Sequence, residues 1–400
     1  MRRGLLSVVA GNRPGVRGAV VDRLLRLSPR AVLLAVSIEC RETGHPVVQR
    51  YLSGVEATGR EASRGATGDP VVILRQDLLE LRRTAGPAHV VLALPEDVDV
   101  LPLMVELWRI RVGSGSLGEF YDPAPVVVGV DPASFMADIG CPHQSLRLWT
   151  GRDRSEPLSP AEAAARQVEA ADALIIPEDA VDGSEQTSAF AALAAQLNSY
   201  ALLLTPVEAG TPETELPQSL VGAGREGAAE EWQARLEPVT VPRSRQGGSR
   251  GVVSLRWQAR RPLHPERLAD ALPTVMSGVV RGRGHLWLCS RPESVVTWRS
   301  AGAYLELREA DRWLEAADSR AWNAASPQRR TLASWFWDAY YGERRNEIVL
   351  TGIDLDQEGI RSALDAALLT DAELSLGRDG WTSFPDRLLG NADSQGRDSR

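Results

Sequence analysis

The sequence predicts an α/β protein in which a larger domain with a parallel sheet precedes a smaller α+β domain. Three observations support this division. Short apolar runs alternate with helical patterns over residues 1–208. Proline, glycine, glutamate, arginine and serine then dominate residues 209–250, which we interpret as a linker. Apolar periodicity returns over residues 251–375, and we expect residues 376–400 to be a largely disordered tail.

The first domain is predicted from buried strands that alternate with amphipathic helices. Its apolar runs are nearly continuous, which is typical of parallel strands covered on both faces by helices. This layout is that of a P-loop or another doubly wound nucleotide-binding domain. We expect strands at residues 5–11, 31–38, 89–94, 126–131, 173–176 and 201–207, and helices at residues 18–27, 76–83, 160–171 and 186–198.

Composition restricts the partners and the compartment. The chain has 45 Lys plus Arg against 53 Asp plus Glu, a formal net charge of −8. This balance argues against nucleic-acid binding by broad phosphate neutralisation, and we expect no direct sequence-specific nucleic-acid binding. The first apolar run, residues 5–10, is too short for a secretory or membrane segment. Because Cys40, Cys141 and Cys289 lie far apart, we expect no disulfide framework and a cytoplasmic location.

The second domain is predicted from a helix followed by antiparallel strands. Pro265 suits a first helical turn, and apolar residues at 268, 272, 275 and 276 form one stripe that ends before Gly278. A strand begins at Val279. Residues 295–300 and 303–308 form a hairpin at Ala301-Gly302, and residues 347–353 form another strand. Asp356 is the expected N-cap of a helix that carries apolar residues at 360, 364 and 368.

Residues 260–288, RRPLHPERLADALPTVMSGVVRGRGHLWL, carry a resemblance to a known family. They resemble the "RPFHPxRL…VxRxKGxxWL" pattern of the C-terminal domain of CobW-like GTP-binding proteins, with Arg283 in place of the usual lysine. The likeness covers residues 251–374. Residues 257–314 and 367–381 most resemble the actinobacterial GTPases that recruit a ribosome hibernation factor. The resemblance implies a P-loop-like G domain, GTP with Mg²⁺ as cofactor, a role in zinc homeostasis and a ribosome-associated partner.

The glycine-rich segment Gly11–Gly18 occupies the place of the phosphate loop. A working loop reads GxxxxGK[ST], in which the lysine reaches the β- and γ-phosphates and the hydroxyl binds Mg²⁺. Alignment on Gly11 puts Val16, Arg17 and Gly18 at the last glycine, the lysine and the hydroxyl. We consider an ordinary strand–helix turn, weak phosphate binding and an intact GTPase. The candidates for weak nucleotide binding are Gly11, Gly15, Arg17 and Gly18.

Three further motifs of the family have also changed. The resemblance places its GCxxC metal motif at residues 68–72, where Asp69 and Val72 replace the cysteines. The guanine-reading NKxD falls on Pro177-Glu178-Asp179-Ala180. The acidic segment after the third strand reads Pro95-Glu96-Asp97, which is either a solvated loop or a metal ligand. Cys141 and His143 provide two ligands only, so we expect no metal site.

Aromatic and basic residues of the second domain form a candidate partner-binding face. Five aromatic residues lie between Trp335 and Tyr341, and tryptophan and tyrosine are enriched at protein interfaces. The alternative is a core helix that closes the sheet. The candidate residues are Arg281, Arg283, Trp335, Trp337, Arg344 and Arg345.

Two functions therefore compete. The first is a non-hydrolysing adaptor with a degenerate G domain, which recruits a hibernation factor to the ribosome under zinc limitation. The second is a nucleotide-dependent zinc or cobalt chaperone. A stable fold without an inherited role is a third option. Since the motifs for phosphate, metal and guanine are all altered, we expect little or no GTP hydrolysis.

Overall fold

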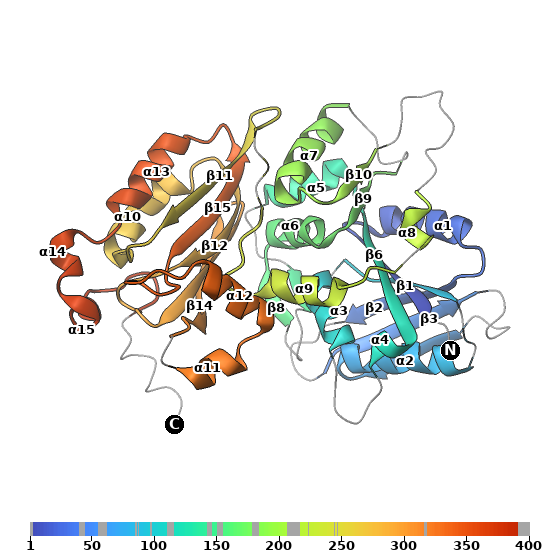
Figure 1. Cartoon of the computed structure of the whole chain (residues 1–400). Helices are drawn as coiled ribbons and strands as arrows, with labels where there is room; N and C mark the ends of the chain where they lie inside the picture. Colours follow the sequence, from blue (N-terminus) through green and yellow to red (C-terminus); the bar gives the residue numbers. More distant parts are fainter. Residues whose placement is uncertain are drawn as a thin grey trace. The chain divides into compact units, whose positions relative to one another are not determined.

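A computed structural model shows two compact units, Met1–Gln233 and Ala234–Arg400, each with its own sheet (Figure 1). The structure describes residues 3–39, 45–54, 62–84, 86, 88–96, 98–109, 116–141, 146–149, 155–177, 184–205, 217–222, 224–243, 245, 247–315 and 318–390. Within these ranges, no helix has the length and apolarity needed to cross a membrane.

The first unit contains an eight-stranded sheet in the order β10-β9-β6-β1-β5-β2-β3-β4. The strands from β10 to β2 are parallel neighbours, as predicted. Strands β3 and β4, which were not predicted from the sequence, extend the sheet by antiparallel pairing. The strands are β1 (Gly4–Gly11), β2 (Val32–Glu39), β3 (Val47–Ser53), β4 (Ala62–Thr67), β5 (His89–Ala93), β6 (Tyr121–Gly129), β9 (Ala173–Ile175) and β10 (Leu202–Leu204), with a separate pair β7 (Leu146–Trp149) and β8 (Ser155–Leu158).

Helices cover both faces of this sheet. Val20 and Leu24 of one helix and Leu220 of another pack against Val9 and Val91 on one face. Val90 and Leu92 are also fully buried, and they point the opposite way because side chains alternate along a strand. The helices are α1 (Pro14–Leu27), α2 (Pro70–Thr84), α3 (Val100–Trp108), α4 (Leu117–Phe120), α5 (Pro132–Ile139), α6 (Pro160–Ala170), α7 (Ser184–Leu197), α8 (Ser219–Gly222) and α9 (Ala228–Leu236).

The expected linker at residues 209–250 is partly structured. It contains α8 and α9, and Trp232 of α9 is fully buried against Trp108, with ring centroids 5.4 Å apart. In the sequence, α9 is indicated only by Trp232, an isolated tryptophan in a polar segment. Burial of a large aromatic surface fixes α9 although its neighbours in sequence are polar.

The second unit contains a five-stranded antiparallel sheet in the order β11-β15-β12-β13-β14. The predicted hairpin turns at Gly302, where the positive φ of 55° suits glycine. The strands are β11 (Val252–Ala259), β12 (Val279–Leu286), β13 (Ser294–Ala301), β14 (Tyr304–Arg312) and β15 (Asn346–Ile353). The helices are α10 (Pro265–Val275), α11 (Ser319–Ala324), α12 (Pro327–Trp335), α13 (Gln357–Ala366), α14 (Asp371–Leu374) and α15 (Gly377–Trp381).

The helices α10 and α13 pack their predicted apolar stripes into the main core of this unit. Leu268 and Val275 are buried, while Leu272 and Met276 pack at the edge of the same cluster. Asp356 caps α13 as predicted, because its Oδ1 accepts a hydrogen bond of 2.9 Å from the Gly359 amide. A second cluster contains Trp287, Trp313 and Trp381.

The expected disorder of residues 376–400 is wrong for residues 376–390. Trp381 of α15 is buried, and its indole N–H donates to the Glu373 carbonyl at 2.8 Å. Asp386 is also buried and accepts a hydrogen bond from Ser290 at 2.7 Å. These two anchors attach the segment to the second unit. Residues 391–400 lie outside the described part of the chain.

Candidate functional site

The turn between β1 and α1 is too short to be a phosphate loop. The strand ends at Gly11 and the helix begins at Pro14, so only Asn12 and Arg13 separate them. A phosphate loop needs several successive backbone N–H groups that surround the anion before the helix starts. Here Gly15, Arg17 and Gly18 already belong to α1, and Pro14 has no N–H. Proline is favoured at the first helical position, so Pro14 was the sequence signal for this early start.

Asn12 bridges the loops after β1 and β6, at the edge of the sheet where doubly wound α/β proteins bind their ligands. β1 and β6 are neighbours from which the chain continues toward opposite sides of the sheet, and ligands bind beyond such strand ends. The Asn12 amide donates to the Asp131 carbonyl at 3.1 Å, and its oxygen accepts from the Asp131 N–H at 3.0 Å. Asn12 is buried. The two loops are thereby connected side by side.

Arg17 is paired with Glu96. These residues stand at the aligned lysine position and in the aligned acidic segment after β5, and their side chains are joined by an ion pair of 2.5 Å. Burial raises the pKa of Glu96, but the hydrogen bond from Arg17, a backbone hydrogen bond and the charges of Arg17 and Arg13 together outweigh burial, so the pKa is lowered. The two groups that would contact phosphate and Mg²⁺ therefore neutralise each other. The sequence contains no lysine, so no other segment can supply the missing ammonium group.

Of the glycines in this segment, Gly11 is needed for close packing, whereas Gly15 and Gly18 have no packing role. A Cβ at Gly11 would lie 3.0 Å from the Gly129 carbonyl, so Gly11 allows a close approach of β1 and β6. A Cβ at Gly15 or Gly18 would meet nothing within 4 Å. These residues therefore do not fit a nucleoside triphosphate with Mg²⁺.

At the aligned metal motif, Asp69 has a structural contact. Its Oδ1 accepts a hydrogen bond of 2.8 Å from the Val71 N–H in the first turn of α2, so the carboxylate caps the helix. In the described ranges, no group of three or more His, Cys, Asp or Glu side chains is placed to hold a metal ion. Cys141 is half-buried there, whereas Cys40, Asp97, His143, Glu178, Asp179 and Ala180 lie outside the described residues.

The candidate partner residues do not form one face. Arg281, Arg344 and Arg345 are buried, Arg283 is half-buried in β12, and Trp335 and Trp337 are exposed by 79% and 39%. Arg344 pairs with Glu293 at 3.2 Å and with Glu315, and Arg345 pairs with Glu347 at 3.1 Å. Buried arginine is tolerated only with such partners. The assignment of Arg281, Arg344 and Arg345 to an accessible surface was wrong.

The aromatic segment after α12 is not the core helix considered as its alternative. The helix ends at Trp335, and Trp335, Trp337 and Tyr340, here called the aromatic platform, are exposed. The platform is held by Asp338, which accepts from the Tyr340 and Tyr341 amides at 2.8 Å each. Asp338 and Gly342 also exchange backbone hydrogen bonds of 2.7 and 2.9 Å. The exposed side chains therefore stand on an ordered turn.

The burial of two histidines, His89 and His285, was not predicted from the sequence. The His89 ring lies between the hydroxyls of Ser7 and Ser28, at 2.8 and 2.9 Å, inside the first unit. Burial lowers the pKa of His89 to about 4. In the second unit, burial and then the charges of Arg345 and Arg329 lower the pKa of His285. Since Ser7 is fully buried, the Ser7–His89 pair has no access to a substrate.

Comparison with known proteins supports the resemblance. Residues 252–368 match the family described as cobalamin synthesis protein cobW C-terminal domain. The chain is 27% identical over 369 residues to "Zinc chaperone Rv0106" of Mycobacterium tuberculosis (strain ATCC 25618 / H37Rv), covering 88% of this chain and 86% of the relative. It is 28% identical over 227 residues to "Zinc-regulated GTPase metalloprotein activator 1" of Dictyostelium discoideum, covering 56% of this chain and 47% of that protein.

A solved structure with partial similarity is the "Zn(II)-bound YjiA GTPase from E. coli". It has 14% sequence identity and a TM-score of 0.38, covering 92% of this chain and 100% of the other. The matched family segment lies within the second unit. The names of the two relatives refer to a zinc chaperone and to a metalloprotein activator, and neither name refers to ribosome hibernation.

Proposed function

Because residues 252–368 form a CobW C-terminal domain, we propose that this chain acts in zinc homeostasis as a non-hydrolysing adaptor. The observation that supports this proposal is the Arg17–Glu96 pair beside a two-residue turn. An enzyme that transfers phosphoryl groups depends on positioned charges around the phosphates and Mg²⁺. Here those positions hold an internal ion pair, and partner binding remains as the route to function.

The aromatic platform is the surface that we propose for the partner. Trp335 and Tyr340 are exposed by 79% and 74%, and Trp337 packs edge-on against Trp322 at 6.3 Å between ring centroids. Tryptophan and tyrosine dominate binding hot spots because they bury a large area with few rotatable bonds. The Asp338 turn orders the platform before binding, so little conformational entropy is lost on association.

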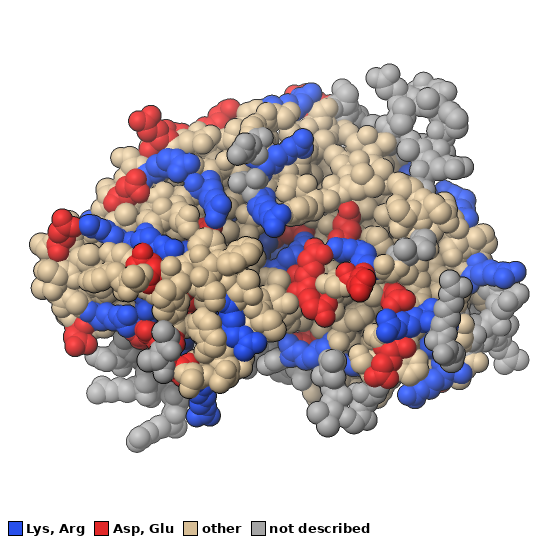
Figure 2. Space-filling model, viewed as in Figure 1, with Lys and Arg blue, Asp and Glu red and all other residues tan. Residues whose placement is uncertain are grey.

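The proposed partner is the ribosome or a ribosome hibernation factor, as the resemblance of residues 257–314 implied. The helices next to the platform carry Arg320 and Arg330, which suit an RNA-rich particle or an acidic protein. On the face drawn in Figure 2, basic and acidic side chains are interspersed, so no single basic field dominates there. Aromatic contact, with local arginine contacts, would then supply most of the binding energy.

Co-sedimentation with ribosomes and hibernation factor tests the adaptor, using cells grown with and without a zinc chelator. We expect Trp335→Ala with Tyr340→Ala to weaken association at least tenfold, equivalent to about 1.4 kcal/mol. Tyr304→Ala is the matched control, since Tyr304 is an aromatic residue exposed by 41% on β14. Undiminished association of the double variant would exclude the aromatic platform as the partner-binding surface. Absence of wild-type association under both conditions removes the adaptor.

The second candidate is a nucleotide-dependent zinc chaperone, which the relatives' names favour. It requires that GTP with Mg²⁺ changes zinc binding, because nucleotide and metal are then coupled. A zinc titration with and without GTP separates the candidates. A change of tenfold or more in zinc affinity supports the chaperone, and an unchanged affinity supports the adaptor.

A further inference from the structure

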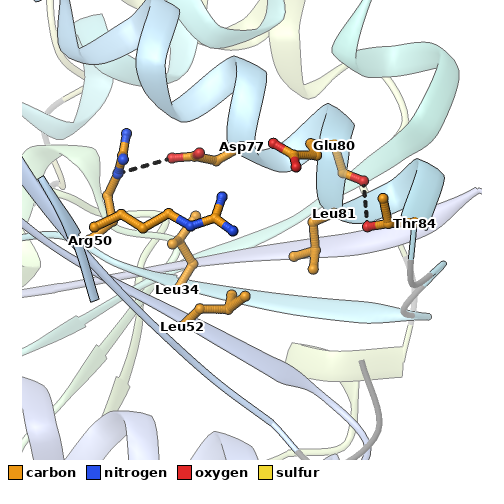
Figure 3. A pocket seen from close by; sticks show the side chains of 8 residues that line it. Leu34, Arg50, Leu52, Asp77, Glu80, Leu81 and Thr84 are labelled. Carbon is orange, nitrogen blue, oxygen red and sulfur yellow. Dashed lines mark hydrogen bonds and ion pairs between the residues drawn. The ribbon is translucent and has the colours of Figure 1, made fainter. Parts of the chain in front are cut away.

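A small cavity lies between the edge strands of the first sheet and helix α2 (Figure 3). Its volume is about 80 Å³. It is remote from the β1–α1 turn in the sheet order, because β5 and β2 separate β1 from β3 and β4. The lining side chains come from β2, β3, β4 and α2: Leu34, Arg50, Leu52, Arg64, Asp77, Glu80, Leu81 and Thr84.

The charges in this cavity balance and are arranged on opposite walls. The strands contribute Arg50 and Arg64, and the helix contributes Asp77 and Glu80. Arg50 Nε lies 3.3 Å from Asp77 Oδ2, and the two side chains are exposed by only 11% and 22%. Both atoms are buried, yet neither makes a hydrogen bond with the described residues. The ion pair is thus misaligned and retains unused donor and acceptor capacity.

The remaining wall is apolar. Leu34 and Leu81 are buried and Leu52 is half-buried, and Figure 3 shows these three side chains near Arg50 and Asp77. An apolar cavity of about 150 Å³ holds benzene, so this cavity of about 80 Å³ encloses only part of a small ligand. The rest of the ligand would lie beside the exposed lining residues Arg64, Glu80 and Thr84. Burial raises the pKa of Asp77, against the lowering effect of the Arg50 and Arg64 charges. The carboxylate is therefore under-solvated and would gain from a cationic partner.

We propose that this cavity binds a small α-amino acid with a short aliphatic side chain. The ligand carboxylate would face Arg50 and Arg64, its ammonium would face Asp77 and Glu80, and its side chain would contact the leucines. A simple anion would be attracted by the two arginines but repelled by the two carboxylates. A simple cation would be attracted by the carboxylates but repelled by the arginines. A zwitterion matches both walls at once, and the apolar wall selects a hydrocarbon side chain.

Isothermal titration of the full chain with L-valine tests the proposal. We expect saturable one-to-one binding, and binding at least tenfold weaker for isovalerate, which lacks the ammonium, and for isobutylamine, which lacks the carboxylate. Arg50→Met and Asp77→Asn are each expected to weaken L-valine binding at least tenfold. Gln76→Ala is the matched control, because Gln76 is exposed on the same helix and does not line the cavity.

Methyl NMR of the wild-type chain locates the ligand without relying on a variant that folds. L-valine is expected to shift the methyl resonances of Leu34, Leu52 and Leu81. Absence of L-valine binding overturns the proposal. Equal affinity for isovalerate also overturns it in favour of an anion site, and binding that leaves these methyl resonances unchanged overturns it by placing the ligand elsewhere.

Discussion

The guanidinium of Arg17 in α1 lies 2.5 Å from the carboxylate of Glu96 after β5, and the pair occupies the positions aligned with the phosphate-binding lysine and the acidic segment. A basic and an acidic side chain at these positions could each contact a nucleotide or its Mg²⁺. Here the two side chains bind each other instead. The short turn adds to this effect. Because α1 starts at Pro14 and its first turn packs close to β6, the turn does not form a loop around a phosphate group.

The first prediction concerns GTP turnover. We expect purified protein with GTP and Mg²⁺ to release no phosphate above background, and Arg17→Ala to leave that result unchanged. The triple variant Val16→Gly, Arg17→Lys, Gly18→Thr restores the motif letters, yet we expect it to remain inactive because the turn still has two residues. Phosphate release by the wild type at about one per minute or faster would contradict the paired-site interpretation.

The second prediction separates a helix glycine from a phosphate-loop glycine. Gly18 lies inside α1 with open space around its missing Cβ. We therefore expect Gly18→Ala to stabilise the chain by about 0.5–1 kcal/mol, because alanine loses less backbone entropy in a helix. Denaturant unfolding gives the change. Gly11→Ala is the contrasting variant and should destabilise, since its Cβ would lie 3.0 Å from the Gly129 carbonyl.

The third prediction concerns zinc. With Asp69 capping α2 and Val72 in place of a ligand, we expect zinc affinity no tighter than roughly micromolar. Competition with a chromogenic chelator measures it. A stoichiometric nanomolar site would refute the expectation, and Cys141→Ala with His143→Ala would then show whether those two residues hold the metal.

Much of the fold could be predicted from sequence because the signals are local. The stripe of α10 and the Asp356 cap each depend on residues within two turns of one another. Strands β3 and β4 escaped prediction because their antiparallel pairing depends on an edge position that no local pattern encodes. The buried arginines escaped for a similar reason: Arg344 finds its partners at Glu293 and Glu315, far away in the chain.

The candidate site shows the same limit. The family's motifs indicate where the phosphate and metal positions are altered. They do not show that Arg17 forms an ion pair with Glu96, because the two residues are 79 positions apart in the sequence. Nor do they show which aromatic residues of the segment 333–341 are exposed, since that depends on where α12 ends.

The fourth prediction uses the buried histidine. The folded-state pKa of His89 is about 4, below its ordinary value of 6.5. The unfolded chain therefore binds the proton more readily, so the stability contributed by neutral His89 is present above pH 6.5 and is lost as the pH falls toward 4. We expect the free energy of unfolding to drop by about 2 kcal/mol between pH 7.5 and pH 5 through this group alone.

Denaturant titrations of the wild type and His89→Asn at both pH values isolate this contribution. The variant should lose less stability on acidification, because asparagine does not titrate. His285 shares the direction of the shift and remains in both proteins, so it does not affect the difference. An equal loss in the two proteins would rule out His89 as a source of the pH dependence.

The last prediction concerns the buried ion pair between Arg329 and Glu343 in the second unit. Arg329 and Glu343 are exposed by 2% and 0% and pair directly, and Glu343 also accepts a hydrogen bond from the Leu314 N–H. Glu343→Gln keeps the shape but leaves the guanidinium with only Asp311, at 3.2 Å, as its acidic partner among the described residues. Removing one partner of a buried ion pair costs about 3–5 kcal/mol, and Asp311 still offsets part of the Arg329 charge, so we expect a loss near the lower end of this range in the free energy of unfolding. Arg329→Met with Glu343→Gln removes the charge as well, and should recover part of the loss. Denaturant unfolding of the two single variants and the double variant gives the coupling energy. A double variant as unstable as the sum of the single changes would show that the pair is not coupled, and would leave packing alone to explain why these residues are buried.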